Sequence, residues 1–209
     1  MPTACITGAS SGIGKEFAAQ LAARGYNLIL VARNTKALEE LAAELACKCR
    51  IISCDLSKEA QCMQLAEELK PLDIHILINN AGFGDLDRFA QSDLSKSLDM
   101  INVNIKALHI LTRKLLPELM KKDRGYILNV ASSAGLLPGA HHRLGHVRLL
   151  RHAQRSHVGA RVGHLGGIVR GRERHAVEHV RVRVGLLIGN DGAGGRTVDQ
   201  IIGQSARVP

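Results

Sequence analysis

Residues 7–14 read T-G-A-S-S-G-I-G, which places glycines at positions 8, 12 and 14 of the chain. The run before them, residues 3–7, is short and β-rich, whereas residues 13–24 repeat apolar side chains at helical spacing. We expect one face of this helix to carry Ile13, Phe17, Ala18 and Leu21, and Gly25 to end it. The glycines therefore occupy a turn that leads from a strand into a helix.

Such a turn has properties that suit a phosphate ligand. Gly8 permits a tight turn, Gly12 lets the backbone approach a pyrophosphate without a Cβ in between, and Gly14 allows the helix to pack closely on the strand. The helix N-terminus adds free N–H groups and the positive end of the helix dipole. The strand–turn–helix setting favours a nucleotide-binding turn over a glycine-rich surface turn.

Strands and helices continue to alternate further along the chain. We predict strands at residues 27–32, 50–54, 74–79 and 125–131, and helices at 58–69 and over the amphipathic stretch 93–121, bent before Pro117. Another helix, capped by Asn34 or Thr35, turns Leu38, Leu41 and Leu45 inward. Residues 27–32 are apolar throughout, as in a strand covered on both faces. This alternation predicts an α/β fold of Rossmann type, a doubly wound parallel sheet in the order 3-2-1-4-5.

The composition changes after Ala140. Residues 141–209 hold 12 Arg, 8 of the 10 His and 12 Gly, but no Lys, Tyr or Phe, and they carry +8 of the net charge of +9. We therefore divide the chain into residues 1–139, a nucleotide-binding domain, and residues 140–209, an Arg/His/Gly-rich tail that leaves the sheet incomplete at its C-terminal end. Within the tail only Val180–Val184 alternates as a strand does, and residues 185–195 resemble a loop.

The five cysteines occupy apolar or helical contexts without a Cys-x-x-Cys pair or a neighbouring His. This pattern favours reduced thiols over a disulfide framework, and the spacing of Cys47 and Cys49 argues against a zinc site, so we expect no metal. No apolar run reaches the roughly 18–20 residues of a membrane span, and the first strand begins too early to leave room for a signal peptide. We expect a cytoplasmic protein without a membrane partner.

Further motifs follow the glycine turn in a recognisable order. C-D-L-S at residues 54–57 follows the third strand, N-N-A-G at 79–82 closes the fourth, and N-V-A-S-S at 129–133 closes the fifth. Together with the G-x-x-x-G-x-G spacing of the turn, residues 3–139 resemble the short-chain dehydrogenase/reductase family. The resemblance implies cofactor contacts by Gly8, Ser10, Ser11, Gly12, Ile13, Gly14, Asp55, Asn79, Ala81 and Gly82.

The end of the second strand indicates which dinucleotide is bound. Enzymes that use NAD place an acid there for the ribose 2′-hydroxyl, whereas an arginine suits the 2′-phosphate of NADP. Residues 31–34 read V-A-R-N, without an acid, and the guanidinium of Arg33 matches phosphate oxygens. We therefore predict NADP(H) as the cofactor and Arg33 as one of its contacts.

The resemblance also implies a reaction, the interconversion of a carbonyl and an alcohol on a small-molecule substrate. Ser132, favoured over Ser133 by its register, is the implied catalytic serine that stabilises the developing alkoxide, and Asn104 is the implied catalytic asparagine that holds a water in the proton relay. The family's proton donor is a tyrosine with a lysine four residues later. No Tyr follows Tyr126 and no Lys follows Lys122, so Tyr-x-x-x-Lys is absent and we expect this chain to be inactive.

Two explanations of the tail stay open. In one, the reading frame was lost near codons 138–146, since Arg, His, Gly and Val make up 42 of the 69 tail residues, as in out-of-frame translation of GC-rich DNA. In the other, the tail is a basic extension that binds polyanions, although it lacks aromatic residues for stacking on nucleic-acid bases. A nucleotide-binding protein without turnover is the alternative to an enzyme. A homo-oligomer fits an intact family member better than this chain.

Overall fold

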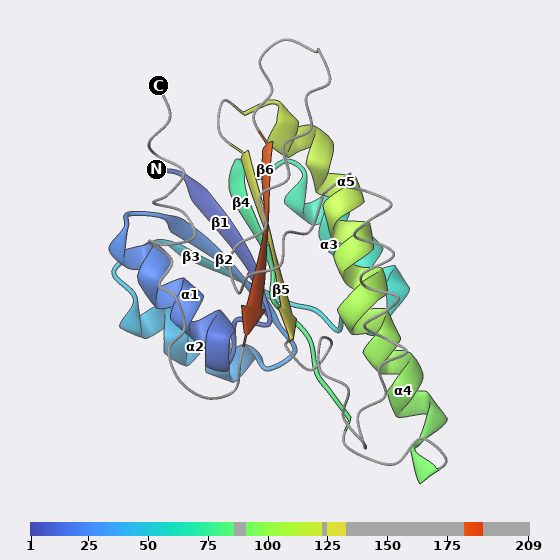
Figure 1. Ribbon diagram of the computed structural model, residues 1–209. Helices are drawn as coiled ribbons and strands as arrows, with labels where there is room; N and C mark the ends of the chain where they lie inside the picture. The colour runs from blue at the N-terminus through green and yellow to red at the C-terminus, as the bar shows by residue number, and fades with distance from the viewer. Residues whose placement is uncertain (86–90, 123–124, 133–181, 190–209) are drawn as a thin grey trace.

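The computed structural model describes residues 1–85, 91–122, 125–132 and 182–189. Six strands within these ranges form one sheet: β1 Thr3–Thr7, β2 Asn27–Ala32, β3 Cys49–Ser53, β4 Ile74–Asn79, β5 Gly125–Ser132 and β6 Val182–Gly189. All neighbouring strands are parallel, in the order β3-β2-β1-β4-β5-β6 (Figure 1). This confirms the predicted order of the first five strands. The winding reverses at β1, and a doubly wound sheet binds its ligand at such a point.

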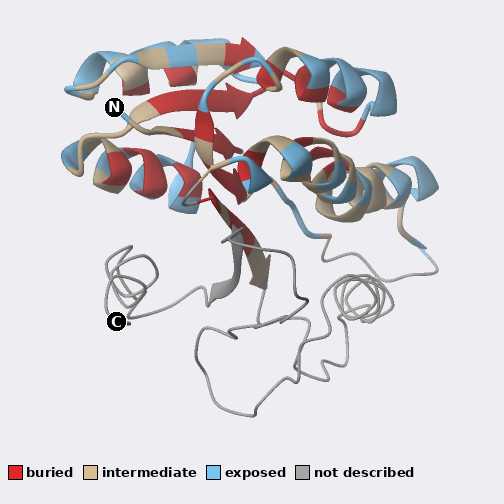
Figure 2. Ribbon diagram, turned by 90° about the horizontal axis from the view of Figure 1, so that it is seen from above, coloured by how far each residue is buried: buried red, intermediate tan, exposed pale blue. Residues whose placement is uncertain are grey.

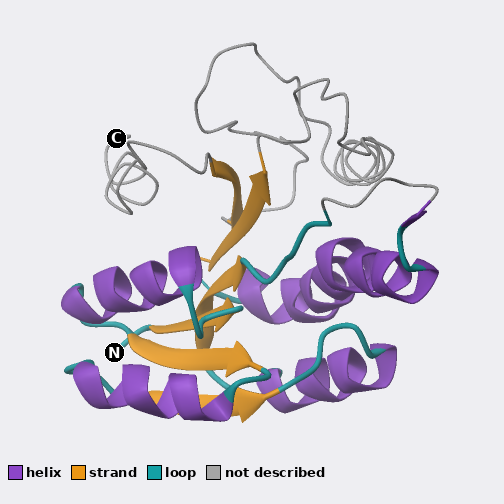
Figure 3. Ribbon diagram, turned by 90° about the horizontal axis from the view of Figure 1, so that it is seen from below, coloured by secondary structure: helices purple, strands orange, loops and turns teal. Residues whose placement is uncertain are grey.

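Helices cover both faces of the sheet (Figure 3). Helices α1 Gly12–Ala23 and α2 Thr35–Glu44 pack on one face, and α3 Glu59–Leu69 and α5 Leu108–Met120 pack on the other. Buried residues follow the strands and the inward faces of the helices (Figure 2). In β2, Leu28 and Leu30 join the core under α1 and α2, whereas Ile29 and Val31 join the core under α3 and α5. The apolar sequence of this strand is thus explained by burial on both faces.

Local signals fix the ends of the first two helices. Gly25 follows α1 with φ +79°, a conformation that glycine adopts without a Cβ penalty. Asn34, rather than Thr35, caps α2, because its side-chain oxygen accepts a hydrogen bond of 3.1 Å from the amide of Ala37. In the part of the chain that the structure describes, no helix combines the length and the apolar character needed to cross a membrane.

Two helical predictions need correction. Ile13 does not join the inward face of α1 but is 43% exposed, since it lies in the first turn, at the edge of the sheet where the helix begins. The predicted helix over residues 93–121 is divided into α4 Leu94–Ile101, a π-helical segment η2 Asn102–Ala107 and α5. Pro117 lies inside α5, and the interruption occurs at η2 instead. The apolar repeat runs through η2, so the pattern alone could not reveal it.

The sixth strand also differs from its prediction. β6 runs from Val182 to Gly189, so residues 185–189 are strand and not loop, whereas residues 180–181 and 190–195 of the two predictions lie outside the described residues. All eight residues of β6 pair with β5, from Gly125 opposite Val182 to Ser132 opposite Gly189. Between Gly185 and Gly189 the sequence reads L-L-I, the continuous apolar pattern of a parallel strand. Such a run lacks the alternation of apolar and polar residues by which a half-buried strand is recognised.

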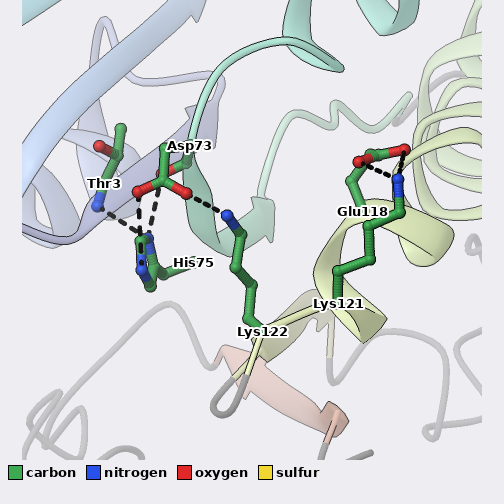
Figure 4. A network of polar contacts seen from close by, with 6 residues as sticks. All are labelled: Thr3, Asp73, His75, Glu118, Lys121 and Lys122. Carbon is green, nitrogen blue, oxygen red and sulfur yellow. Dashed lines mark hydrogen bonds and ion pairs between the residues drawn. The ribbon is translucent and has the colours of Figure 1, made fainter.

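Polar contacts join three elements, α5, β1 and β4, at the amino edge of the sheet (Figure 4). Lys122, directly after α5, forms an ion pair with Asp73, which precedes β4. The ring of His75 contacts the amide of Thr3 at 3.4 Å and the carbonyl oxygen of Asp73 at 3.0 Å. These contacts hold the end of α5 beside the start of β1 and β4, far from the glycine turn.

Candidate functional site

The glycine turn follows β1 at the carboxyl edge of the sheet. Gly8 has φ +67° and Gly12 has φ +51°, both in the left-handed region that favours glycine. The amides of Gly8 and Ala9 donate to the carbonyl oxygen of Val31 at 2.8 and 3.3 Å. The turn is therefore held against the end of β2, two residues before Arg33.

The three glycines are required for different reasons. A Cβ at Gly14 would lie 2.1 Å from the carbonyl oxygen of Gly8, and a Cβ at Gly8 would lie 2.8 Å from Cα of Ala81. At Gly12, by contrast, no atom from the described part of the chain lies within 4 Å of the Cβ position. Gly8 and Gly14 therefore allow close contacts inside the protein, whereas Gly12 leaves the backbone open to a ligand.

Helix α1 begins with its amide groups available. Ser11 is the N-cap residue and has an extended backbone, and within the described residues its side chain makes no capping hydrogen bond. The first turn of α1 holds no acidic residue. Because the first amides of a helix have no acceptor within it, they and the positive end of the dipole can bind an anion. Ser11, Gly12 and Ile13 are exposed and Ser10 is half-buried, so this end of the helix is accessible.

Thr7 and Asn80 connect the turn to β4. The hydroxyl of Thr7 donates to the carbonyl oxygen of Ile78 at 3.3 Å and accepts from the amides of Asn80 at 3.0 Å and Ala81 at 3.1 Å. Nδ2 of Asn80 donates to the carbonyl oxygens of Thr7 at 3.0 Å and Gly8 at 3.1 Å. Neither side chain was among the predicted cofactor contacts, although both fix the turn where β1 and β4 diverge.

Asn79 faces away from the turn. Its side chain is buried, and Nδ2 donates to Oδ1 of Asn129 at 2.9 Å and to the hydroxyl of Thr112 at 3.1 Å. These bonds join β4 to β5 and α5, so the structure places Asn80, and not the side chain of Asn79, at the glycine turn. Successive side chains of a strand point to opposite faces, and this alternation was the signal that could have separated the two asparagines.

Arg33 and Asp55 lie at the ends of neighbouring strands, β2 and β3. Arg33 is exposed and has no ion pair with any residue that the structure describes. Oδ1 of Asp55 accepts from the amide of Ser57 at 3.0 Å. Partial burial acts to raise the pKa of Asp55, but the hydrogen bonds from Ser57 and the charges of Arg33 and Lys58 outweigh it and lower this pKa below its ordinary value. Asp55 therefore stays ionised beside Arg33.

Asn104 holds the segment that follows β4. It lies in η2, where Nδ2 donates to the carbonyl oxygen of Phe83 at 2.8 Å and Oδ1 accepts from the amide of Phe83 at 3.1 Å. A Cβ at Gly82 would lie 3.2 Å from this Oδ1, so glycine allows the two segments to approach. The amide of Asn104 is thus occupied by the backbone of Phe83, a residue that the sequence analysis did not mention.

Ser132 is the last residue of β5, at the same edge of the sheet as the glycine turn. Tyr126 lies at the opposite end of β5, where it pairs with Ile76. Ser132 lies six positions after Tyr126 along the strand, about 20 Å away at a rise of roughly 3.3 Å per residue. Tyr126 therefore cannot replace the tyrosine that the family pattern places near the serine.

Comparison with known proteins identifies the family. The model of the short chain dehydrogenase family matches residues 2–144. Among curated proteins, the very-long-chain 3-oxoacyl-CoA reductase of Phaeosphaeria nodorum is 39% identical over 145 residues, which cover 65% of this chain and 42% of that protein. The reductase of the same name from Neurospora crassa is 40% identical over 144 residues, 65% of this chain and 43% of that protein. The chain thus spans less than half the length of these relatives.

Solved structures give the same result. A short-chain dehydrogenase from Sphingobium yanoikuyae in complex with NADPH is 32% identical, with a TM-score of 0.68 over 75% of this chain and 66% of that one. A metagenomic short-chain oxidoreductase in complex with NADP is 25% identical, with a TM-score of 0.72 over 90% of this chain and 81% of that one. Since the family match covers more than half of the sequence and the sheet has the same architecture, this chain belongs to the short-chain dehydrogenase family.

Proposed function

We propose that residues 1–139 form a domain that binds NADP(H), with Gly8, Ser10, Ser11, Gly12, Ile13, Gly14, Arg33, Asp55, Ala81 and Gly82 as its contacts. The observation that carries the proposal is the open backbone at Gly12 beside an uncapped, acid-free helix N-terminus. These groups fit a pyrophosphate. The exposed Arg33, without an acid at the end of β2, fits the additional 2′-phosphate of NADP.

Titration of the chain with NADPH and NADH tests the cofactor preference. NADPH should bind more tightly, and Arg33→Ala should weaken it by about tenfold or more, since a charge-assisted contact contributes roughly 1.5–3 kcal/mol. Arg33→Asp should reverse the preference. Arg50→Ala is the matched control, because Arg50 is also exposed but lies on β3 and pairs with Glu68 at 2.7 Å. Equal affinities of the unchanged chain for both cofactors would refute the proposal.

We further propose that the family activity of this fold is carbonyl–alcohol interconversion. We propose that this chain is inactive in that reaction. The bound nicotinamide would supply hydride to the carbonyl carbon. Ser132 is proposed to stabilise the developing alkoxide. The side chain of Asn104 is proposed to position the Gly82–Phe83 segment, while the backbone of Asn104 holds a water. Without Tyr-x-x-x-Lys, no residue of the described site donates a proton readily at neutral pH.

A paired assay tests the missing proton donor. NADPH oxidation is measured with a panel of ketones, aldehydes, quinones and a 3-oxoacyl-CoA, the last because the reductases from two fungi are named for it. The comparison is a chain whose reading frame is restored after codon 138 so that Tyr and Lys are supplied. Activity only in the restored chain supports the proposal. Equal activity in both chains, abolished by Ser132→Ala, would mean that another residue donates the proton.

The alternative is a nucleotide-binding protein whose function does not involve catalytic turnover. It rests on the same cofactor site together with the absent catalytic pair. A restored chain that binds NADPH but reduces none of the panel would favour this alternative.

A further inference from the structure

Two cysteine side chains meet at the amino end of β3, at the opposite edge of the sheet from the glycine turn. The Sγ atoms of Cys47 and Cys49 lie 3.6 Å apart, and Sγ of Cys49 also lies 3.8 Å from the carbonyl oxygen of Cys47. Both residues are half-buried free thiols. From Cys49, β3 runs to Ser53 near the cofactor edge, about 13 Å away at the usual rise of a strand.

The geometry points to Cys47 and Cys49 as a dithiol site that small anionic disulfides, such as oxidised glutathione, convert to an intrachain disulfide. The sulfur atoms need to approach by about 1.6 Å to reach the S–S bond length of about 2.05 Å. Cys49 is held by the pairing of β3 with Leu28 of β2, whereas Cys47 lies in the bend before the strand and can adjust.

The surroundings give an anionic oxidant access to Cys49. A hollow of about 230 Å³ opens beside Cys49, and Lys48 and Arg50 line it. Lys48 is exposed, and no ion pair ties it to another described residue. Asp73 also lines the hollow, but its charge is balanced by Lys122 (Figure 4). Arg50 is likewise paired with Glu68, so Lys48 supplies the net positive charge of this basic rim, which the carboxylates of a glutathione disulfide meet.

The other three cysteines are not equivalent. Cys5, Cys54 and Cys62 are buried in the core. The thiols of Cys54 and Cys62 donate to the carbonyl oxygens of Gln61 at 3.7 Å and Leu56 at 3.3 Å. Selective oxidation of the Cys47–Cys49 pair follows from this difference in access.

The chemistry is a balanced exchange. One protein thiol loses its proton and its thiolate attacks a sulfur of the oxidant, whose S–S bond breaks and releases one thiolate. The second protein thiol loses its proton and attacks the mixed disulfide at the protein sulfur, which releases the second thiolate. Two protein thiols are thereby oxidised by two electrons, and the low-molecular-weight disulfide is reduced to two thiols.

Peptide mass spectrometry of the full chain tests the site. The reduced chain is treated with oxidised glutathione, the remaining thiols are alkylated, and trypsin then cuts after Lys36, Lys48 and Arg50. The expected product is the peptide of residues 37–48 linked to the dipeptide Cys49-Arg50, or the uncut peptide of residues 37–50 short of two hydrogens. Cys54 and Cys62 fall in separate tryptic peptides and should remain alkylated. No oxidation, a Cys54–Cys62 link, or stable glutathione adducts on both Cys47 and Cys49 would overturn the proposal.

Two variants sharpen the test. In Cys47→Ser, Cys49 should keep a single glutathione adduct, because the resolving thiol is gone. Lys48→Gln should slow thiol loss about twofold to fivefold with oxidised glutathione but not with the neutral bis(2-hydroxyethyl) disulfide; an equal effect on both oxidants would contradict the role of the basic rim. NADPH affinity should be unchanged in both variants, so this site can fail independently of the cofactor site.

Discussion

At the scale of single residues, Gly12 and Gly14 have different roles. Gly12 leaves the backbone open to a ligand, whereas Gly14 allows a close contact inside the protein. Gly14→Ala should destabilise the fold by several kcal/mol, because its Cβ would lie 2.1 Å from the Gly8 carbonyl oxygen. Gly12→Ala meets no described atom, so it should cost only about 1–2 kcal/mol for the left-handed backbone, while NADPH affinity falls. Urea unfolding and fluorescence titration of both variants check this. Unchanged NADPH affinity in Gly12→Ala would refute the assigned ligand approach.

Asp55 provides a prediction about pH. Its pKa in the folded chain lies below the ordinary value, so ionised Asp55 stabilises the fold above the unfolded pKa, and this contribution is lost as pH falls through the folded pKa. A carboxyl-carbon NMR titration should give a midpoint below the ordinary pKa of an aspartate. Arg33→Ala should raise the midpoint, because it removes one of the charges that lower it. A midpoint that Arg33→Ala leaves unchanged would show that the two charges do not interact.

At the scale of elements, the two neighbouring asparagines at the end of β4 should have different effects: Asn79 on the stability of the fold, and Asn80 on cofactor binding. Asn79→Ala removes the two hydrogen bonds of a buried side chain that join β4 to β5 and α5, and should lower the free energy of unfolding by about 1–3 kcal/mol. Asn80→Ala removes the bonds to Thr7 and Gly8, and should weaken NADPH binding more than Asn79→Ala does. Denaturant unfolding and cofactor titration of the two variants, measured side by side, decide between these roles.

The helices and strands could be predicted where their buried faces leave a periodic pattern of apolar residues in the sequence. The apolar run of β2 and the repeats of α3 and α5 mark surfaces that the sheet covers, and these predictions are confirmed. Ile13 fits the same repeat but lies where no strand covers it, which periodicity cannot report. The clamp of Asn104 on Phe83 and the contact between Cys47 and Cys49 depend on backbone geometry and on side-chain rotamers, neither of which leaves a repeat in the sequence.

At the scale of the whole molecule, β6 brings a piece of the basic tail into the sheet. The amides of residues 182–189 should exchange more slowly than those of a free tail, because every residue of β6 pairs with β5. Limited trypsin digestion should spare Arg183 longer than an arginine in an unfolded peptide. Hydrogen exchange followed by mass spectrometry provides the measurement. Full exchange of residues 182–189 within seconds would show that β6 does not persist in solution.

The bonds between Thr7 and the Asn80–Ala81 segment also determine when, during synthesis, the site can exist. Their partners are 73 and 74 residues apart in the chain, so the glycine turn leaves the ribosome well before the groups that fix it. Until β4 follows, β1 has only β2 beside it and exposes an unpaired apolar edge, the kind of surface that chaperones cover. Under the proposed function, a dinucleotide in the cell can therefore stabilise the nascent chain only after Ala81 has emerged.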